Sequence, residues 1–278
     1  MKNIILAICL ILYPITAHAE TTYERVMRTG VIKCGYILWA PWFDMDIATQ
    51  KPSGINYDYV EALGRNLNLK IEWTMEVPPG SQVEMLRTGK IDAICSADGP
   101  MIPSTIKYIS YSTPMLYLPM HLYARSDDTR FAKDWLSTIN SETVKISVID
   151  GDVSAQTAHI FFRKAQTISI PQLGTPSQMM MDVVARKADI VINDPLSMAE
   201  YFKHNQGVLK MVNRDPIAVI PNTLSVLRNY ENMAFLNMLN QAIQNMKDSG
   251  EEQIILSPHH KNQNGEDNFY MSGTAYAK

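Results

Sequence analysis

Short apolar runs alternate with helix-like segments along the first half of the chain. The runs at 31–37, 69–73 and 91–95 have the length and the β-branched or alternating character of strands. The segments between them, at 57–67 and 81–88, have the spacing and the end signals of helices. This β-α-β-α-β order predicts a parallel sheet with helices on its faces.

The same order returns in the second half. Apolar runs at 144–149, 168–173 and 188–192 predict strands, and helices are predicted from Ser154 onward and over 175–187. Two α/β units in series predict an α/β fold with two lobes and a cleft between them. Ligands of open parallel sheets bind beyond the carboxyl ends of the strands, so the loops at those ends are the candidate site.

The first nineteen residues have the three-part pattern of a cleavable secretory signal peptide. Lys2 precedes an apolar run over 4–15, and Ala17 and Ala19 are the small residues before a cut. A bilayer-spanning helix needs about 20 apolar residues, which this run does not reach. We therefore expect a periplasmic protein cleaved after Ala19, and without a lipid anchor, because no cysteine follows the cut.

The C-terminal part contains one amphipathic helix and a polar end. Apolar residues recur at helical spacing over 231–247. From His259 onward the residues are mostly polar, which predicts an extended or poorly ordered tail.

Composition and charge exclude several classes of protein. A content of 46% hydrophobic and 19% charged residues in 278 predicts a folded chain. The formal net charge of −3 argues against nucleic acid as a partner. The six histidines are scattered and the cysteines are only three, so we expect no metal site, no cofactor and no disulfide framework.

Six short motifs follow one another through most of the chain, and several fall on the loops after predicted strands. They are GVIKCG at 30–35, WAPWF at 39–43, SGINYD at 53–58, LRTGKIDAI at 86–94, SYSTP at 110–114 and ADIVIND at 188–194.

In this order and spacing the motifs resemble those of the bacterial extracellular solute-binding proteins of the polar amino-acid ABC transporter type. The resemblance covers about 29–256. It implies two lobes joined by two crossing strands: a first lobe of 20–122 and 218–278, and a second lobe of 123–217. It also implies a monomer that captures a small polar solute between the lobes and delivers it to a membrane permease, without catalysis.

The family places an aromatic ring against the ligand near Trp39, whose indole face suits an apolar group or a cation. Trp42 is a second candidate contact. The alternative for both residues is that they pack the loop onto the lobe.

In the first lobe the resemblance makes Ser96, Ala97 and Asp98 candidate ligand contacts, since the family offers hydroxyls and amides there to a carboxylate. The family then supplies an arginine that clamps the carboxylate. This chain has Thr105 at that position. The nearby Lys107 lacks the planar fork of an arginine, which argues against a standard α-amino acid as the ligand.

In the second lobe the candidate contacts are Asp152, Ser154 and Asp194. The family's carboxylate-binding helix N-terminus here carries Asp152, which would oppose an anion or else cap its own helix. Asp194 matches the acidic residue with which the family binds the ligand's amino group. The alternative is that its carboxylate caps nearby backbone amides. If Asp98, Asp152 and Asp194 all face the cleft, the ligand is cationic, or neutral and polar.

Cys34 and Cys95 lie on first-lobe strands that the family places side by side. The two cysteines can form a disulfide in an oxidising compartment. Because a direct bridge between neighbouring parallel strands is geometrically awkward, we favour two buried thiols.

Two other functions compete with transport. A sensor or partner-binding protein would keep the fold and the hinge but signal through a membrane receptor. A dehydratase-like enzyme acting on cyclic carboxylic acids would need a general acid and a cationic anchor, and the missing arginine argues against it.

Overall fold

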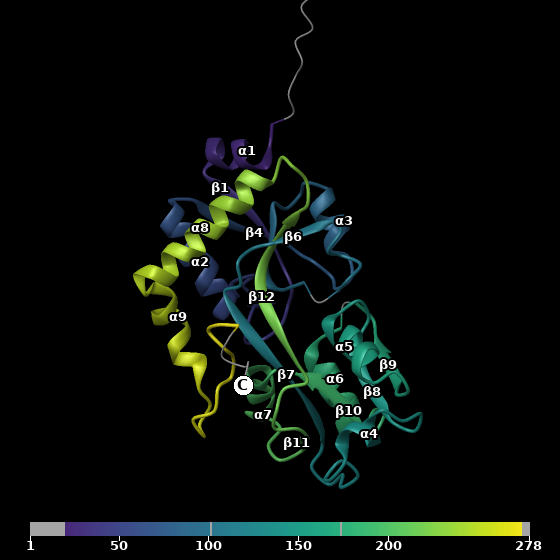
Figure 1. Ribbon diagram of the computed structural model, residues 1–278. Helices are drawn as coiled ribbons and strands as arrows, with labels where there is room; N and C mark the ends of the chain where they lie inside the picture. The colour runs from purple at the N-terminus through teal and green to yellow at the C-terminus, as the bar shows by residue number, and fades with distance from the viewer. Residues whose placement is uncertain (1–19, 101, 173, 274–278) are drawn as a thin grey trace, which may run out of the picture.

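The computed structural model describes residues 20–273 except 101 and 173, so the predicted signal peptide lies outside the described residues. Figure 1 shows an α/β molecule of two lobes, with long strands running from one lobe into the other. Within the described part of the chain, no helix has the length and apolar character that crossing a membrane requires.

The first lobe is built on parallel strands with helices on both faces. Strand β1 (Val31–Tyr36) lies between β4 (Lys70–Glu76) and β5 (Ala93–Asp98) and pairs with both in parallel. This confirms the predicted first sheet, with strand ends shifted by a few residues. The helices of this lobe are α1 (Thr22–Thr29), α2 (Ile55–Leu67), α3 (Gln82–Arg87), α8 (Met233–Ser249) and α9 (Glu251–His260).

The second lobe repeats the arrangement. Strand β8 (Lys145–Ile149) pairs in parallel with β9 (Gln166–Ile170) and β10 (Ile190–Asn193), as predicted. The helices of this lobe are α4 (Trp135–Ile139), α5 (Val153–Phe161), α6 (Pro176–Val184) and α7 (Pro195–Phe202).

Two ten-residue strands connect the lobes: β7 (Leu116–Arg125) and β12 (Ala218–Leu227). They pair with each other in antiparallel fashion where they cross, β12 continues beside β5, and β7 continues beside β10. One sheet path therefore runs through both lobes (Figure 1). The remaining strands are short: β2 (Asp44–Met45), β3 (Pro52–Ser53), β6 (Ile109–Tyr111) and β11 (Leu209–Met211).

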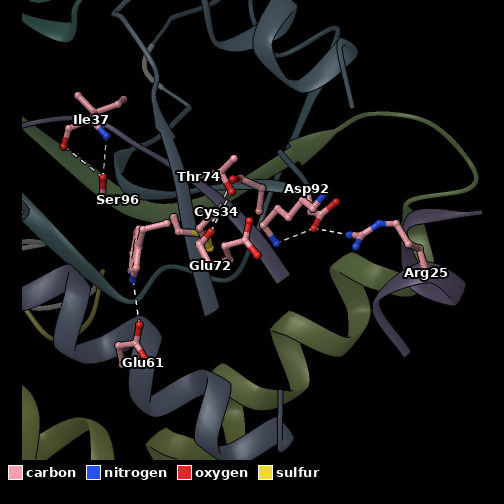
Figure 2. The surroundings of a disulfide bond; sticks show 12 residues. Arg25, Cys34, Ile37, Glu61, Glu72, Thr74, Asp92 and Ser96 are labelled. Atoms are coloured by element: carbon pink, nitrogen blue, oxygen red, sulfur yellow. Dashed lines mark hydrogen bonds and ion pairs between the residues drawn. A yellow bond between two sulfur atoms is a disulfide. The ribbon is translucent and has the colours of Figure 1, made fainter. Parts of the chain in front are cut away.

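Cys34 and Cys95 form a disulfide, which corrects the prediction of two buried thiols (Figure 2). The residue beside Cys34 on the neighbouring strand is Ala93, so Cys95 lies two positions farther along. This diagonal placement brings the two Cα atoms to 5.5 Å, within the usual range for a disulfide. The prediction of free thiols assumed that the two cysteines would be directly paired across the strands. Because they are offset by two residues, that geometric difficulty does not arise.

The tail was expected to be extended or poorly ordered, and as far as residue 273 the structure corrects the second alternative. Helix α9 runs to His260, and the chain then turns back to pair Tyr270 with Tyr117 of the connecting strand β7. Phe269 is fully buried, with its ring at 5.6 Å from the Trp42 ring in an edge contact. We call residues 268–273 the C-terminal strap.

Candidate functional site

A pocket lies between the lobes, where the carboxyl ends of strands from both lobes meet the crossing strands. This is the location expected for a ligand of open parallel sheets. Its walls are mostly apolar, and its charged members are three aspartates. The described lining residues are Ile37, Trp39, Trp42, Pro79, Gln82, Asp98, Gly99, Ile102, Leu118, Met120, Asp152, Val153, Asp194, Ile220, Pro221 and Asn222, with no lysine or arginine among them.

Asp98 ends strand β5 and has one oxygen without a partner. Its Oδ1 accepts a hydrogen bond from the Gly99 amide at 2.9 Å, whereas Oδ2 is buried with no hydrogen-bond partner in the described structure. Burial raises the pKa of Asp98 to about 6, and the charge of Asp152 adds to the rise. The Gly99 amide opposes the rise, and so does the nearby Ser225 hydroxyl, although that hydroxyl does not meet hydrogen-bond geometry with Oδ2. Asp98 can therefore accept a hydrogen bond or a positive charge from a ligand.

Asp152 faces the same pocket from the second lobe. It is the N-cap of α5, and its Oδ2 accepts from the Ser154 amide at 2.9 Å. Burial raises the pKa of this carboxyl, and hydrogen bonds from Ser154 and the Val153 amide oppose the rise. Asp152 therefore caps its own helix and also lines the pocket.

Asp194 lines the pocket too, but four donors already occupy its oxygens. As the N-cap of α7 it receives the amides of Leu196 and Ser197, and its Oδ2 accepts from the Ser197 hydroxyl at 2.7 Å. The fourth donor is the Trp42 Nε1–H group, at 3.1 Å. Asp194 therefore fulfils the capping role and also joins the lobes.

Two indole groups of the first lobe reach the second lobe directly. Trp42 donates to Asp194, and Trp39 Nε1–H donates to the Ser197 hydroxyl at 3.1 Å. All four residues are buried. We call these two bonds the indole latch. They hold the lobes together on one side of the pocket.

The structure brings together five of the residues singled out from the sequence and leaves three outside the pocket wall. Ser96 is buried beside it, where its hydroxyl bonds both backbone groups of Ile37 (Figure 2). Thr105 bonds the Ile102 carbonyl and the Tyr111 hydroxyl, and the Ser154 hydroxyl accepts from the Ile149 amide. The side chain of Ala97 lies outside what the structure describes. The five residues in the wall are Trp39, Trp42, Asp98, Asp152 and Asp194.

Two polar wall residues were missed from the sequence. Gln82, from the first turn of α3, and Asn222, from the crossing strand β12, are both buried in the pocket wall. Each has an amide oxygen without a partner in the described structure, and the Asn222 amide donates to Asn56 Oδ1 at 3.1 Å. No local pattern marks them, because they approach the pocket only through the tertiary fold.

The described residues contain no group of three or more His, Cys, Asp and Glu side chains placed to hold a metal ion. The aspartates of the pocket instead meet apolar walls and amide groups. This arrangement is chemically suited to an organic molecule with a positively charged or donor-rich group.

Comparisons with known proteins agree with this architecture. Residues 32–261 match the bacterial extracellular solute-binding proteins, family 3. No protein of curated function matches the chain.

Several solved structures share the fold. The ancestral amino acid-binding protein AncCDT-1, a precursor of cyclohexadienyl dehydratase, is 23% identical with a TM-score of 0.71, covering 86% of this chain and 98% of that one. An ancestral arginine-binding protein bound to arginine is 18% identical with a TM-score of 0.70, covering 82% and 97%. The VFT2 domain of Bordetella pertussis BvgS is 18% identical with a TM-score of 0.68, covering 86% and 98%.

Proposed function

Because the chain belongs to the bacterial extracellular solute-binding proteins, family 3, we propose that it is the periplasmic substrate-binding component of an ABC importer. It captures a small polar, positively charged solute between its lobes. The observation that carries this proposal is the placement of Asp98 and Asp152, from opposite lobes, in one pocket whose described wall has no lysine or arginine. Such a pocket favours a cation over an anion.

The proposed division into a first lobe of 20–122 and 218–278 and a second lobe of 123–217 fits a hinge made of β7 and β12. Closure of such lobes is a hinge motion, which buries the solute and presents a closed shape to the permease. We propose that the protein works as a monomer and without a cofactor.

A sensor is the second candidate function. The indole latch joins the lobes through protein groups, so closure depends less on a ligand than it would in a pocket bridged by solute alone. A domain of BvgS shares the fold. In this alternative the closed form would contact a membrane receptor rather than a permease.

An enzyme is the third and weakest candidate. AncCDT-1 is described as a precursor of cyclohexadienyl dehydratase, and Asp98 could serve as an acid. A cyclic carboxylic acid would, however, meet three aspartates and no cationic anchor among the described lining residues. We therefore expect no turnover of cyclohexadienyl carboxylic acids, which an absorbance assay would check.

A thermal-shift screen tests the binding function. The panel consists of amino acids, polyamines, quaternary amines and short peptides. A ligand at 100 times its Kd adds about 2.7 kcal/mol of stability, enough for a clear shift. A shift with cationic solutes supports the proposal, and no shift with any small molecule would favour the partner-binding alternative.

A further inference from the structure

Three oxygen atoms in the pocket wall are buried without a hydrogen-bond donor. They are Asp98 Oδ2, Gln82 Oε1 and Asn222 Oδ1, and their residues are only 8%, 4% and 1% exposed. A buried acceptor left unpaired is costly, so native proteins rarely keep several in one place without a partner. A ligand that brings hydrogen-bond donors would pair all three.

The carboxylate that resemblance assigns to a ligand's amino group already accepts four hydrogen bonds from the protein. Asp194 already receives Trp42, Leu196 and Ser197, the last through both its amide and its hydroxyl. A cation at Asp194 would have to share its oxygens with the indole latch and the helix cap. The free acceptor capacity lies instead at Asp98, on the first-lobe side of the pocket.

The charges around Asp98 oppose a carboxylate on the ligand. Asp152 is close enough from the second lobe to add to the rise in the pKa of Asp98. No lysine or arginine stands in the described wall to receive an anion. Apolar residues make up much of the wall, and Ile37, Leu118 and Ile220 are available to a hydrocarbon chain.

We propose, building on the proposed binding function, that the natural ligand is a primary amine without a carboxylate, and that its ammonium group binds between Asp98 and Asp152. An ammonium offers three N–H donors, which match the unpaired oxygens of Asp98, Gln82 and Asn222. A quaternary ammonium carries the charge but leaves those oxygens unpaired. An α-amino acid brings a carboxylate into a pocket that repels it.

Matched pairs of ligands test this by calorimetric titration of the wild-type protein. Phenethylamine is compared with phenylalanine, isopentylamine with leucine, and putrescine with ornithine. We expect at least one amine to bind tenfold or more tightly than its parent amino acid, and its N,N,N-trimethyl derivative to bind at least tenfold more weakly. An amino acid that binds as tightly as its amine would overturn this inference and leave the solute-binding function standing. If no primary amine binds but another solute of the thermal-shift panel does, this inference alone is overturned; if nothing in either panel binds, both are.

Substitutions test whether the ammonium group binds between Asp98 and Asp152. Asp98→Asn and Asp152→Asn keep the shape of the side chains, and Asp152→Asn also keeps an oxygen that can cap α5. Each substitution should weaken the binding of the amine at least tenfold. Asp248→Asn is the matched control, because Asp248 bonds Gln244 on the exposed face of α8. Circular dichroism and unfolding curves show that each variant is folded. An amine that binds both pocket variants as tightly as it binds the control would refute the assignment to Asp98 and Asp152.

Discussion

The acidic side chains of the pocket differ in what they do for the folded state. Asp98 has a buried oxygen without a partner, whereas every oxygen of Asp194 is used. A buried, unpaired carboxylate destabilises the fold when it ionises, and a saturated carboxylate stabilises it. The two residues should therefore respond in opposite directions to substitution.

Asp98→Asn should stabilise the ligand-free protein at pH 7.5. The pKa of Asp98 is raised to about 6 in the fold, so the folded state binds the proton more tightly than the unfolded state. Stability from this group is full below pH about 4 and is lost as the pH rises to about 6. A rise of this size corresponds to at most about 3 kcal/mol in the free energy of unfolding. The wild type loses this stability when Asp98 ionises, and the variant, which has no charge to bury, should keep it at pH 7.5.

Urea unfolding of both proteins at pH 4 and pH 7.5 measures this difference. The titratable groups that interact with Asp98 are Asp152 and Tyr111, and burial raises the pKa of Tyr111 to about 12, so it stays neutral. Asp152 is present in both proteins. A variant that is less stable than the wild type at pH 7.5 would contradict the assignment of Asp98 as an unpaired carboxylate.

Asp194→Ala should destabilise the protein by about 2–4 kcal/mol. The change removes the cap of α7 and leaves the buried Trp42 N–H group without its acceptor. Asp134→Ala is the control, since Asp134 caps the short helix α4 near the surface and should cost about 1 kcal/mol or less. Equal stability of Asp194→Ala and wild type in urea would show that Asp194 is free to bind ligand.

At the scale of elements, the sequence predicts the strands and helices whose pattern is local. The run at 31–37 corresponds to β1, and the apolar spacing over 231–247 corresponds to α8, whose buried residues include Phe235, Leu239 and Ile243. The crossing strands were expected only from family resemblance, because Pro119 and Pro221 interrupt their patterns. Helix α9 was missed.

The site was predictable in position but not in detail. Asp98 ends strand β5, and Asp152 and Asp194 lie in the loops after β8 and β10, as the parallel-sheet rule indicated. That Asp194 is saturated, and that Gln82 and Asn222 have unpaired oxygens, depends on contacts between residues distant in the sequence. The disulfide likewise depends on a register offset of two residues, which composition does not show.

The disulfide should stabilise the folded protein mainly by restricting the conformations of the unfolded chain. Cys34 and Cys95 are 61 residues apart, so loop closure gives about 4 kcal/mol as an upper value. The Cys34→Ala/Cys95→Ala variant should be less stable by up to that amount. Dithiothreitol should lower the unfolding midpoint of the wild type and leave that of the variant unchanged; a wild type insensitive to complete reduction would contradict this.

The C-terminal strap should stabilise the first lobe through one aromatic side chain. Phe269 is fully buried and packs its ring against Trp42, so Phe269→Ala should cost about 3–5 kcal/mol. Tyr230→Ala is the control, because the Tyr230 side chain is 95% exposed. Equal unfolding midpoints for the two variants would show that the strap does not support the fold.

At the scale of the whole molecule, the balance between open and closed lobes depends on bonds that cross the cleft. The indole latch crosses it through Trp39 and Trp42, and a hydrogen bond of this kind contributes about 0.5–1.5 kcal/mol. Trp39→Phe/Trp42→Phe keeps an aromatic ring at each position and removes both donors; the loss of volume from Trp to Phe is shared by the Trp73→Phe control. The closed form of the ligand-free protein should therefore lose about 1–3 kcal/mol relative to the open form, which lowers the ratio of closed to open molecules about fivefold or more.

Small-angle X-ray scattering of the ligand-free proteins measures this shift as a larger radius of gyration in the double variant. Trp73→Phe is the matched control, because the Trp73 Nε1–H group donates to Glu61 within the first lobe, at 2.9 Å, and does not cross the cleft. A bound amine should restore the compact form of the double variant, since the ammonium joins Asp98 and Asp152 across the same cleft. Identical scattering of the double variant and the Trp73 control would show that the latch does not set the balance, and that closure rests on the hinge strands and the ligand alone.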